Sequence, residues 1–361
     1  MKDINLWQFI LQRLKSKELV TLLQVVESIG SSPGRQGFRM AVVAASAARQ
    51  EGVLLGSIGG GVMEQKLVTL ARSRMREGRV EPLIKKQIHN KEVVQDQSGM
   101  ICSGEQTVLF YTFKEEDIII IEKIIACLNQ NYTQNNIAVT ASGAWREGVL
   151  FLSDKIGLQF LNKKNDNNYL CIKSEESIVY EENLGFKNHL YIIGGGHCSL
   201  ALSKQMRLLD SFKIHLLDDR DDLNTFIEND FAHVKLTVDY AHISDFVPEG
   251  NTHYVVIMTV GYRTDDVVLR GLLSKRFKYI GLLGSQAKVD TMFQNLRNEG
   301  VGEDVLKKIH APIGLSLKSQ TPEEIAVSIA AEIIGVRWDA DFFVIQKESL
   351  LCICKGKRDS Y

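Results

Sequence analysis

The sequence predicts an α/β protein, with a mixed α/β domain at the N-terminus and a domain built on a parallel sheet after it. The chain has 361 residues, and at about 150 residues per domain this length favours two domains. Two glycine-rich segments each follow a predicted strand and open a predicted helix. After residue 188, short apolar strands alternate with helical patterns, which is typical of βαβ units in a parallel sheet.

The composition excludes several classes of protein. Lys and Arg number 43 and Asp and Glu number 44, so the net charge is −1 and a duplex-binding domain is not expected. Hydrophobic residues make up 45% of the chain, which is enough for a folded core. No apolar run reaches the roughly 18 residues of a membrane-spanning helix, and the first residues lack a secretory-signal pattern. We therefore expect a cytoplasmic protein with no nucleic acid and no membrane among its partners.

The first 113 residues predict a mixture of helices and strands. Apolar residues at helical spacing predict helices over 5–16 and over Val62–Arg76. Turn residues from Ser31 to Gly34 separate the first two strands. The strands are predicted over Val20–Ser28, Phe38–Ala45, Gly52–Ile58 and Gln106–Phe113.

The segment 114–185 has the least regular pattern. It contains a predicted helix over Glu116–Asn129 and two or three strands. The pattern then changes between residues 183 and 188, where we place the domain boundary. The predicted divisions are domains over 1–185 and 186–336 and a C-terminal tail over 337–361.

The second domain predicts a Rossmann-like arrangement. A strand over Leu190–Ile193 leads directly into glycines and then into a helix over Leu200–Leu209. The last helix, Ile325–Val336, follows Thr321 and Glu324, whose spacing predicts a capping box. Between these ends, strands are predicted over Lys213–Leu217, Val234–Val238, Tyr254–Val260 and Tyr279–Leu283, and helices over Asp265–Leu273 and Ala287–Glu299.

The segment from Gly194 to Ser199 is a candidate phosphate-binding turn. Gly194 would allow the tight turn and Gly196 the close approach of a pyrophosphate to the helix N-terminus. Asp218 ends the second strand, where an acidic side chain would meet a ribose hydroxyl. His197 at the helix start would bind phosphate, contact a metal or substrate, or simply begin the helix. A Rossmann-like fold without a nucleotide explains the same pattern.

A second glycine-rich turn lies in the first domain. Gly59, Gly60 and Gly61 link a predicted strand to a predicted helix, so their N–H groups are candidates for holding an anion. Glu64 in the first helical turn would accept a hydrogen bond from a ligand or favour the helix dipole. A purely structural turn fits the pattern as well.

Cys102 is the cysteine in the most unusual local context. It lies between Gly99 and Gly104 in a loop of small residues, which would bring a thiolate near a soft metal. An ordinary packed thiol is the alternative. Of the other five cysteines, Cys127 falls in a predicted helix, Cys171 in a predicted strand and Cys198 in the segment from Gly194 to Ser199. Cys352 and Cys354 form a Cys-x-Cys pair in the tail, which an alternating buried strand explains as well as a metal does.

These motifs together resemble the XdhC/CoxI family of xanthine dehydrogenase accessory proteins. The resemblance covers roughly residues 18–113 and 186–336. The matching segments are Val26–Pro33 with Gly37 and Met40, Gly56–Gly61 with Glu64, Met100–Cys102 with Gly104 and Glu105, Gly194–His197 with Asp218–Arg220, Gly281–Ser285, Ala311–Leu315, and Thr321–Ile329 with Ala331–Ile333.

The resemblance implies a chaperone-like carrier of the molybdenum cofactor rather than a turnover enzyme. Such a carrier binds the molybdopterin, protects it while a cysteine desulfurase exchanges an oxygen for sulfur, and delivers it to a xanthine dehydrogenase-type apoenzyme. The resemblance also implies a homodimer. It places Cys102 near the metal, and it adds Ser285 to the glycines, Glu64, His197 and Asp218 as ligand-binding residues.

The chain departs from the family pattern at three loops. The family's Cys-Gly-Gly-Glu is Cys102-Ser103-Gly104-Glu105 here, and its Gly-Ser-Arg is Gly284-Ser285-Gln286. The family's Thr-His-x-His-x-x-Asp becomes Thr259 to Asp265 without either histidine. These departures put a metal or proton-transfer role of the last loop in question and point to an altered ligand.

An NAD(P)-dependent oxidoreductase of the Rossmann class is the alternative function. Asp218 at the ribose position would favour NAD over NADP if a dinucleotide binds.

Overall fold

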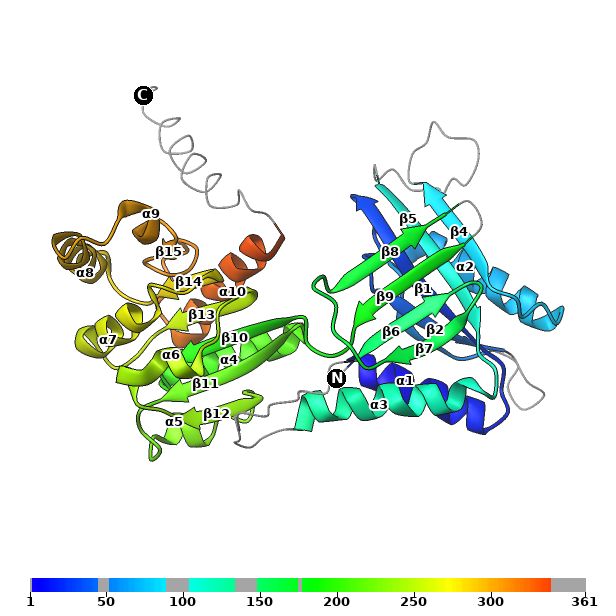
Figure 1. The fold of residues 1–361 in the computed structure, drawn as a ribbon, viewed down its shortest axis with the longest axis horizontal. Coiled ribbons are helices and arrows are strands. Elements are labelled where there is room, and N and C mark those ends of the chain that lie inside the picture. The colour runs from blue at the N-terminus through cyan, green and yellow to red at the C-terminus, as the bar shows by residue number, and fades with distance from the viewer. Residues whose placement is uncertain (1, 45–51, 89–103, 134–147, 175–176, 339–361) are drawn as a thin grey trace, which may run out of the picture. The chain divides into compact units, whose positions relative to one another are not determined.

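The computed structural model describes residues 2–44, 52–88, 104–133, 148–174 and 177–338, and Figure 1 shows their fold. The described residues up to Gly185 form one compact unit and those from Phe186 form a second. The predicted fold class is confirmed, because an α/β unit precedes a unit with a parallel sheet. Of the predicted tail over 337–361, the first two residues belong to the last helix, and residues 339–361, with Cys352 and Cys354, lie outside the described residues.

The first unit contains a five-stranded antiparallel sheet in the order β3-β2-β1-β5-β4. Its central strand β1 places side chains alternately on two faces, as the period of a strand requires. Leu22 faces the core that contains α1 and α3, and Leu23 faces the core beneath α2. The strands are β1 (Val20–Gly30), β2 (Arg39–Val43), β3 (Leu54–Ser57), β4 (Leu83–Ile88) and β5 (Gly104–Thr112), and the helices are α1 (Lys2–Lys15), α2 (Gly61–Arg76) and α3 (Asp117–Thr133).

The segment that was least regular in sequence folds into a helix and a second antiparallel sheet. This sheet has four strands in the order β7-β6-β9-β8, where two or three were expected. Each strand is only five or six residues long, so the apolar pattern of any one of them is brief. The strands are β6 (Val149–Ser153), β7 (Gly157–Leu161), β8 (Tyr169–Lys173) and β9 (Ile178–Asn183).

The second unit is a six-stranded parallel sheet in the order β12-β11-β10-β13-β14-β15. Helices cover both faces: α4 and α10 share one core with the sheet, and α7 and α8 share the other. The strands are β10 (Asn188–Ile193), β11 (Phe212–Asp218), β12 (Val234–Thr237), β13 (Gly250–Ile257), β14 (Phe277–Leu282) and β15 (Ile309–His310). The order reverses between β10 and β13, and open sheets of this kind bind ligands at such a reversal.

The helices of the second unit follow the strands in alternation, as expected. The longer ones are α4 (His197–Leu209), α7 (Tyr262–Leu272), α8 (Gln286–Asn298) and α10 (Pro322–Trp338), and the short ones are α5 (Asn224–Ile227), η1 (Tyr240–His242), α6 (Ile243–Phe246) and α9 (Glu303–Leu306). The predicted capping box is confirmed, since Glu324 N–H donates to Thr321 Oγ1 over 3.2 Å and Thr321 N–H donates to Glu324 over 3.3 Å. None of the helices in the described part of the chain is long and apolar enough to cross a membrane.

One predicted strand ends in the wrong place. The apolar run Tyr254–Val260 suggested a strand through Val260, but β13 ends at Ile257. Thr259 leaves the sheet because its N–H and hydroxyl both bond to Asp265 in the first turn of α7. The run therefore ends in a loop at the carboxyl edge of the sheet, where the cavity described below is found.

Candidate functional site

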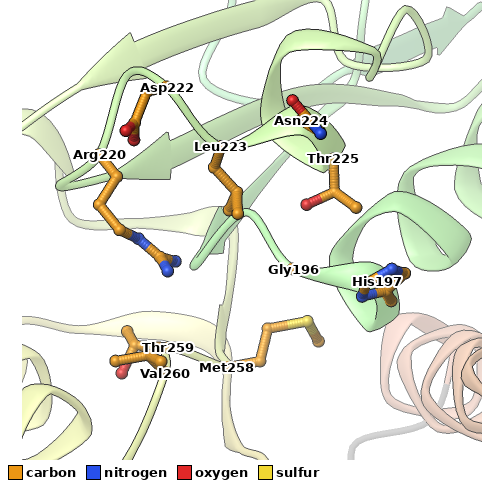
Figure 2. Close-up of a pocket in the computed structure, with 10 residues that line it drawn as sticks. All are labelled: Gly196, His197, Arg220, Asp222, Leu223, Asn224, Thr225, Met258, Thr259 and Val260. Atoms are coloured by element: carbon orange, nitrogen blue, oxygen red, sulfur yellow. The ribbon is translucent and has the colours of Figure 1, made fainter.

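A cavity of about 640 Å³ lies at the carboxyl ends of β10, β11 and β13. Figure 2 shows its lining: His197 from the start of α4, Arg220 and Thr225 from the segment after β11, and Thr259 and Val260 from the loop after β13. This volume falls within the range of about 300–1,000 Å³ that small-molecule sites occupy. The position is the strand-order reversal at which a doubly wound sheet binds its ligand.

The turn between β10 and α4 requires glycine at one position and leaves another open. Gly194 has φ +109°, and a Cβ there would lie 2.3 Å from the carbonyl oxygen of Met258. A Cβ on Gly196 would meet nothing within 4 Å, so this glycine faces open space in the cavity lining. Ser199 replaces the third glycine of the usual pattern; it is fully buried and donates a hydrogen bond to Gly194 O. The turn thus combines a close strand-to-helix connection with room for a ligand.

The backbone N–H groups at the start of α4 lie beside this cavity. Gly196 is the N-cap, and a glycine has no side chain with which to cap the first turn. The first N–H groups of any helix lack intrahelical partners and carry the positive end of its dipole. His197 is exposed at the same end and lines the cavity. The arrangement is suited to a phosphate.

Asp218 lies beneath the cavity instead of lining it. Its side chain is fully buried, and it accepts hydrogen bonds from Gly195 N–H at 2.5 Å and from Arg220 N–H, Nε and Nη2 at 2.9, 2.8 and 3.0 Å. Burial alone would raise the pKa of Asp218, but the bonds from Arg220 and Gly195 outweigh it and lower the pKa. The carboxylate therefore stays charged and ties the glycine turn to the segment after β11.

Arg220 is a functional candidate that the sequence reasoning passed over. Its guanidinium is about one third exposed and lines the cavity, where Asp218 had been expected. Thr225 was also missed; its hydroxyl donates to Gly195 O at 2.6 Å and it belongs to the same lining. The signal for Arg220 was its place two residues after the acidic residue that ends the second strand.

A buried ion pair organises the loop after β13. Asp265 is fully buried, bonds to Thr259 N–H at 2.9 Å and forms an ion pair with Lys288. Lys288 also donates to Leu283 O at 3.0 Å, which joins the loops after β13 and β14. The position of the family's first histidine is held by Val260, whose exposed side chain lines the cavity. This loop therefore lines the cavity with Thr259, whose hydroxyl is bonded to Asp265, and with the apolar side chain of Val260.

Ser285 has a structural role in this structure. It is the N-cap of α8, where its hydroxyl accepts a bond from Lys288 N–H at 3.3 Å. It is exposed and is not among the residues that line the cavity. Its assignment as a ligand-binding residue stays a prediction.

A buried carboxylate on α10 holds the segment Ala311–Leu315 in place. Glu332 accepts bonds from Tyr279 Oη at 2.6 Å, Gly314 N–H at 2.8 Å and His310 Nδ1 at 3.0 Å. Burial would raise the pKa of Glu332, but the bonds from His310 and Tyr279 lower it. This motif of the sequence thus serves to position the end of the sheet.

The glycine turn of the first unit has three residues with positive φ, two of which face open space. Gly59, Gly60 and Gly61 have φ values of +125°, +76° and +70°, a region that favours glycine. A Cβ on Gly60 or Gly61 would meet nothing within 4 Å, whereas one on Gly59 would lie 2.6 Å from Gly34 N. The outer two glycines therefore leave space for an approaching ligand.

Glu64 binds the donors of its own turn. Its carboxylate accepts from Ser57 Oγ at 2.7 Å, Ile58 N–H at 2.8 Å and Gly60 N–H at 3.0 Å. An anion at this turn would have to use other donors or displace Glu64. In this structure Glu64 caps the turn.

Three loops of the first unit meet around one buried glutamine. Gln106 Oε1 accepts from Ser32 Oγ at 2.8 Å and Gly34 N–H at 3.1 Å, and its Nε2 donates to Ile58 O at 3.4 Å. A Cβ on Gly104 would lie 2.5 Å from Ser32 N, so the start of β5 also packs on the first turn. Motif residues far apart in sequence are brought to one end of the sheet.

Cys102 itself lies outside the described residues, two positions before Gly104. Cys127 is buried and Cys171 lies in β8, as their patterns predicted. Within the described part of the chain, no group of three His, Cys, Asp or Glu side chains has a geometry that would hold a metal ion.

Comparison with known proteins identifies two regions of the chain. Residues 13–85 match the model of the XdhC and CoxI family, and residues 190–333 match the model of the XdhC Rossmann domain. Together these matches span more than half of the chain.

Two curated relatives match over shorter stretches. The uncharacterized protein YqeB of Escherichia coli is 31% identical over 169 residues, which is 46% of this chain and 30% of YqeB. A Bacillus subtilis protein, named as a probable xanthine dehydrogenase subunit, is 35% identical over 82 residues, which is 23% of each protein. The matched part is thus less than a third of either relative's length.

A solved structure has the same fold over nearly the whole chain. It is described as a xanthine dehydrogenase from Bacillus halodurans and matches with a TM-score of 0.62 at 21% identity, covering 93% of this chain and 96% of that chain. The fold, the glycine turns and the two matched models agree, and the chain belongs to the XdhC/CoxI family.

Proposed function

We propose that the chain is an accessory protein that binds the molybdenum cofactor and assists the maturation of a xanthine dehydrogenase-type molybdenum hydroxylase. The observation that carries the proposal is the meeting of three motif-bearing loops at Gln106, at the end of the sheet where β5 begins two residues after Cys102. Family membership and the name of the Bacillus subtilis relative support it.

The first unit would hold the pterin beside Cys102. Gly60 and Gly61 are open to an approaching ring, and Gly34 and Gly104 allow the neighbouring loops to pack closely behind them. A thiolate is a soft ligand and suits molybdenum better than a hydroxyl or a carboxylate does. The residues that the structure describes at this end of the sheet are compatible with a pterin, and Cys102 would lie near the metal.

The second unit would hold a phosphate group. Gly196, His197 and the first N–H groups of α4 line the cavity and offer the donors that a phosphate requires. When bound, the cofactor would supply the hydroxylation chemistry of the client enzyme. The residues of this chain would bind it, orient it and limit its contact with water.

The proposed partners are a xanthine dehydrogenase-type apoenzyme, a cysteine desulfurase and a second copy of the chain. In this scheme the cofactor is held while an oxygen on molybdenum is exchanged for sulfur, and it is then delivered. The family resemblance supports each of these partners, and the name of the Bacillus subtilis relative supports the first.

The test is the cofactor content of protein purified from cells that make molybdenum cofactor. We expect molybdenum and released pterin in comparable amounts with the wild-type chain and a several-fold loss of both in Cys102→Ala. Cys171→Ala is the matched control, since Cys171 lies half-buried in β8. Pterin no higher than background in the wild-type protein would refute the proposal. Equal retention of the cofactor in Cys102→Ala and Cys171→Ala would remove Cys102 from the site.

An NAD(P)-dependent oxidoreductase is the second candidate function. It is favoured by the cavity at the strand-order reversal, which is the usual dinucleotide position in this fold. Reduction of a substrate by NADH or NADPH in the presence of pterin-free protein would support it over the carrier function.

A further inference from the structure

We infer that the cavity of the second unit selects a nucleotide with a phosphate on the 2′ position of its ribose, through Arg220. The inference rests on the phosphate-binding role that is proposed for this cavity, and it is tested separately from the pterin proposal. It reverses the preference for an unphosphorylated ribose that Asp218 had suggested from sequence.

The first step is that Asp218 has no capacity for a ribose hydroxyl. An ionised carboxylate offers about four lone-pair sites. The four bonds from Gly195 N–H and from Arg220 N–H, Nε and Nη2 occupy all of them. The carboxylate is also fully buried, so a ribose would have to displace a bond to reach it.

The second step is that Arg220 takes the place that the acid would have had. It lies two residues beyond the end of β11, and its guanidinium lines the cavity (Figure 2). A guanidinium has five N–H donors, and the side-chain bonds to Asp218 use two of them. The remaining three are sufficient for a two-point contact with phosphate oxygens.

The third step is the position of Arg220 relative to the glycine turn. In a Rossmann-like sheet the pyrophosphate lies at the turn after the first strand, and the adenosine ribose lies at the end of the second. Here these positions correspond to Gly196 and to Arg220, two residues beyond the end of β11, and both residues line one cavity. An arginine at the second position is the arrangement that accommodates a 2′-phosphate.

The charges around Arg220 limit how strongly it can favour a ligand with a 2′-phosphate. Asp218 already neutralises much of the guanidinium charge, and Asp219 Oδ1 lies 3.5 Å from Arg220 Nε. Asp222 also lines the cavity, but it is exposed to solvent and therefore screened. Selection must rest on directional N–H bonds, and we expect a preference of about tenfold, which corresponds to about 1.4 kcal/mol.

The experiment is a calorimetric titration of nucleotide-free full-length protein with three ligands. Adenosine 2′,5′-bisphosphate carries the 2′-phosphate, 5′-AMP lacks it, and adenosine 3′,5′-bisphosphate carries the same charge at the neighbouring position. We expect the first ligand to bind at least tenfold more tightly than the other two. Equal binding of 5′-AMP, equal binding of the 3′,5′ isomer, or no binding of any of them would overturn the inference.

Variants test whether Arg220 is the selecting residue. In Arg220→Gln the preference for the 2′,5′ ligand should fall below threefold, with binding of 5′-AMP retained. Arg263→Gln removes the same charge from an exposed position in the first turn of α7 and should leave the preference unchanged. An unchanged preference in Arg220→Gln would assign the selection elsewhere. Cofactor content is measured separately, so failure of the pterin proposal and failure of this inference are distinguishable.

Discussion

The two glycine turns of the molecule look alike in sequence and differ in how their N–H groups are used. In the first unit, Glu64 of the following helix accepts bonds from Ile58 and Gly60 and so caps its own turn. In the second unit, the carboxylate comes from the neighbouring strand, as Asp218, and binds only Gly195 of the turn. At the start of α4 the N-cap, Gly196, has no side chain and lines the cavity. A strand, three glycines and a helix indicate an anion site only when no carboxylate of the chain already fills it.

The largest expected effect is the loss of stability when one glycine of each turn is replaced by alanine. Gly194→Ala adds a Cβ 2.3 Å from Met258 O at φ +109°, and we expect a loss of about 3 kcal/mol or more in the free energy of unfolding of the second unit. Gly60→Ala meets nothing within 4 Å and should cost only the strain of its φ of +76°, about 1 kcal/mol. Urea denaturation followed by circular dichroism measures both. Equal losses would show that packing against Met258 does not distinguish the turns.

The next effect tests the self-capping of the first turn. Glu64→Ala leaves Ser57, Ile58 and Gly60 without their acceptor, so we expect a loss of about 1–2 kcal/mol in the free energy of unfolding. Gln65→Ala, one residue along at an exposed position of the same helix, is the control and should be nearly neutral. Stability unchanged in Glu64→Ala would mean that the bonds of Glu64 contribute nothing net.

The third comparison concerns acid. Seven of the eight histidines follow residue 185, so protonation should weaken the second unit before the first. Burial lowers the pKa of His215 well below its usual value, and His189, Lys213, His233 and His253 around it lower it further. Burial, followed by the charges of Arg207 and Lys213, also lowers the pKa of His233, to about 3.

The sign of the pH dependence follows from these directions. Both histidines bind fewer protons in the folded state than in the unfolded state, so their contribution is complete above about pH 6.5 and is lost as the pH falls. We expect each histidine to lower the free energy of unfolding by up to about 1.4 kcal/mol per pH unit below about pH 6.5. Urea midpoints between pH 7 and 5 should fall in the wild type and less steeply in His215→Phe, while His242→Asn, at an exposed site, follows the wild type. A flat profile in the wild type would contradict this account.

Much of the fold was predictable because its signals are local. The strand at Leu190–Ile193, the glycines after it and the capping box at Thr321 each depend on neighbours a few residues away, and the structure confirms them. Between residues 149 and 183 the sequence predicted only two or three strands, whereas the structure has four. The pairing of such short strands is set by tertiary contacts, which the sequence pattern does not show. The end of β13 was misplaced because Asp265, six residues further on, binds Thr259.

The candidate site was predicted only in outline, and the reason is competition for hydrogen bonds. The sequence identified Asp218 and Glu64 as groups available to a ligand, but both accept several bonds from the chain itself. Arg220 was overlooked because nothing in a single sequence shows that its acidic neighbour is buried. Which polar groups remain for a ligand depends on distances between segments far apart in the chain.

Hydrogen exchange at the two turns tests the account most directly. Protein purified with molybdenum cofactor is compared with the same protein after the cofactor has been removed, and exchange is followed by mass spectrometry. We expect slower exchange in the cofactor-loaded protein over residues 56–64 and over residues 194–200. Unchanged exchange at both turns in protein shown to contain pterin would contradict the claim that these glycine turns bind the cofactor.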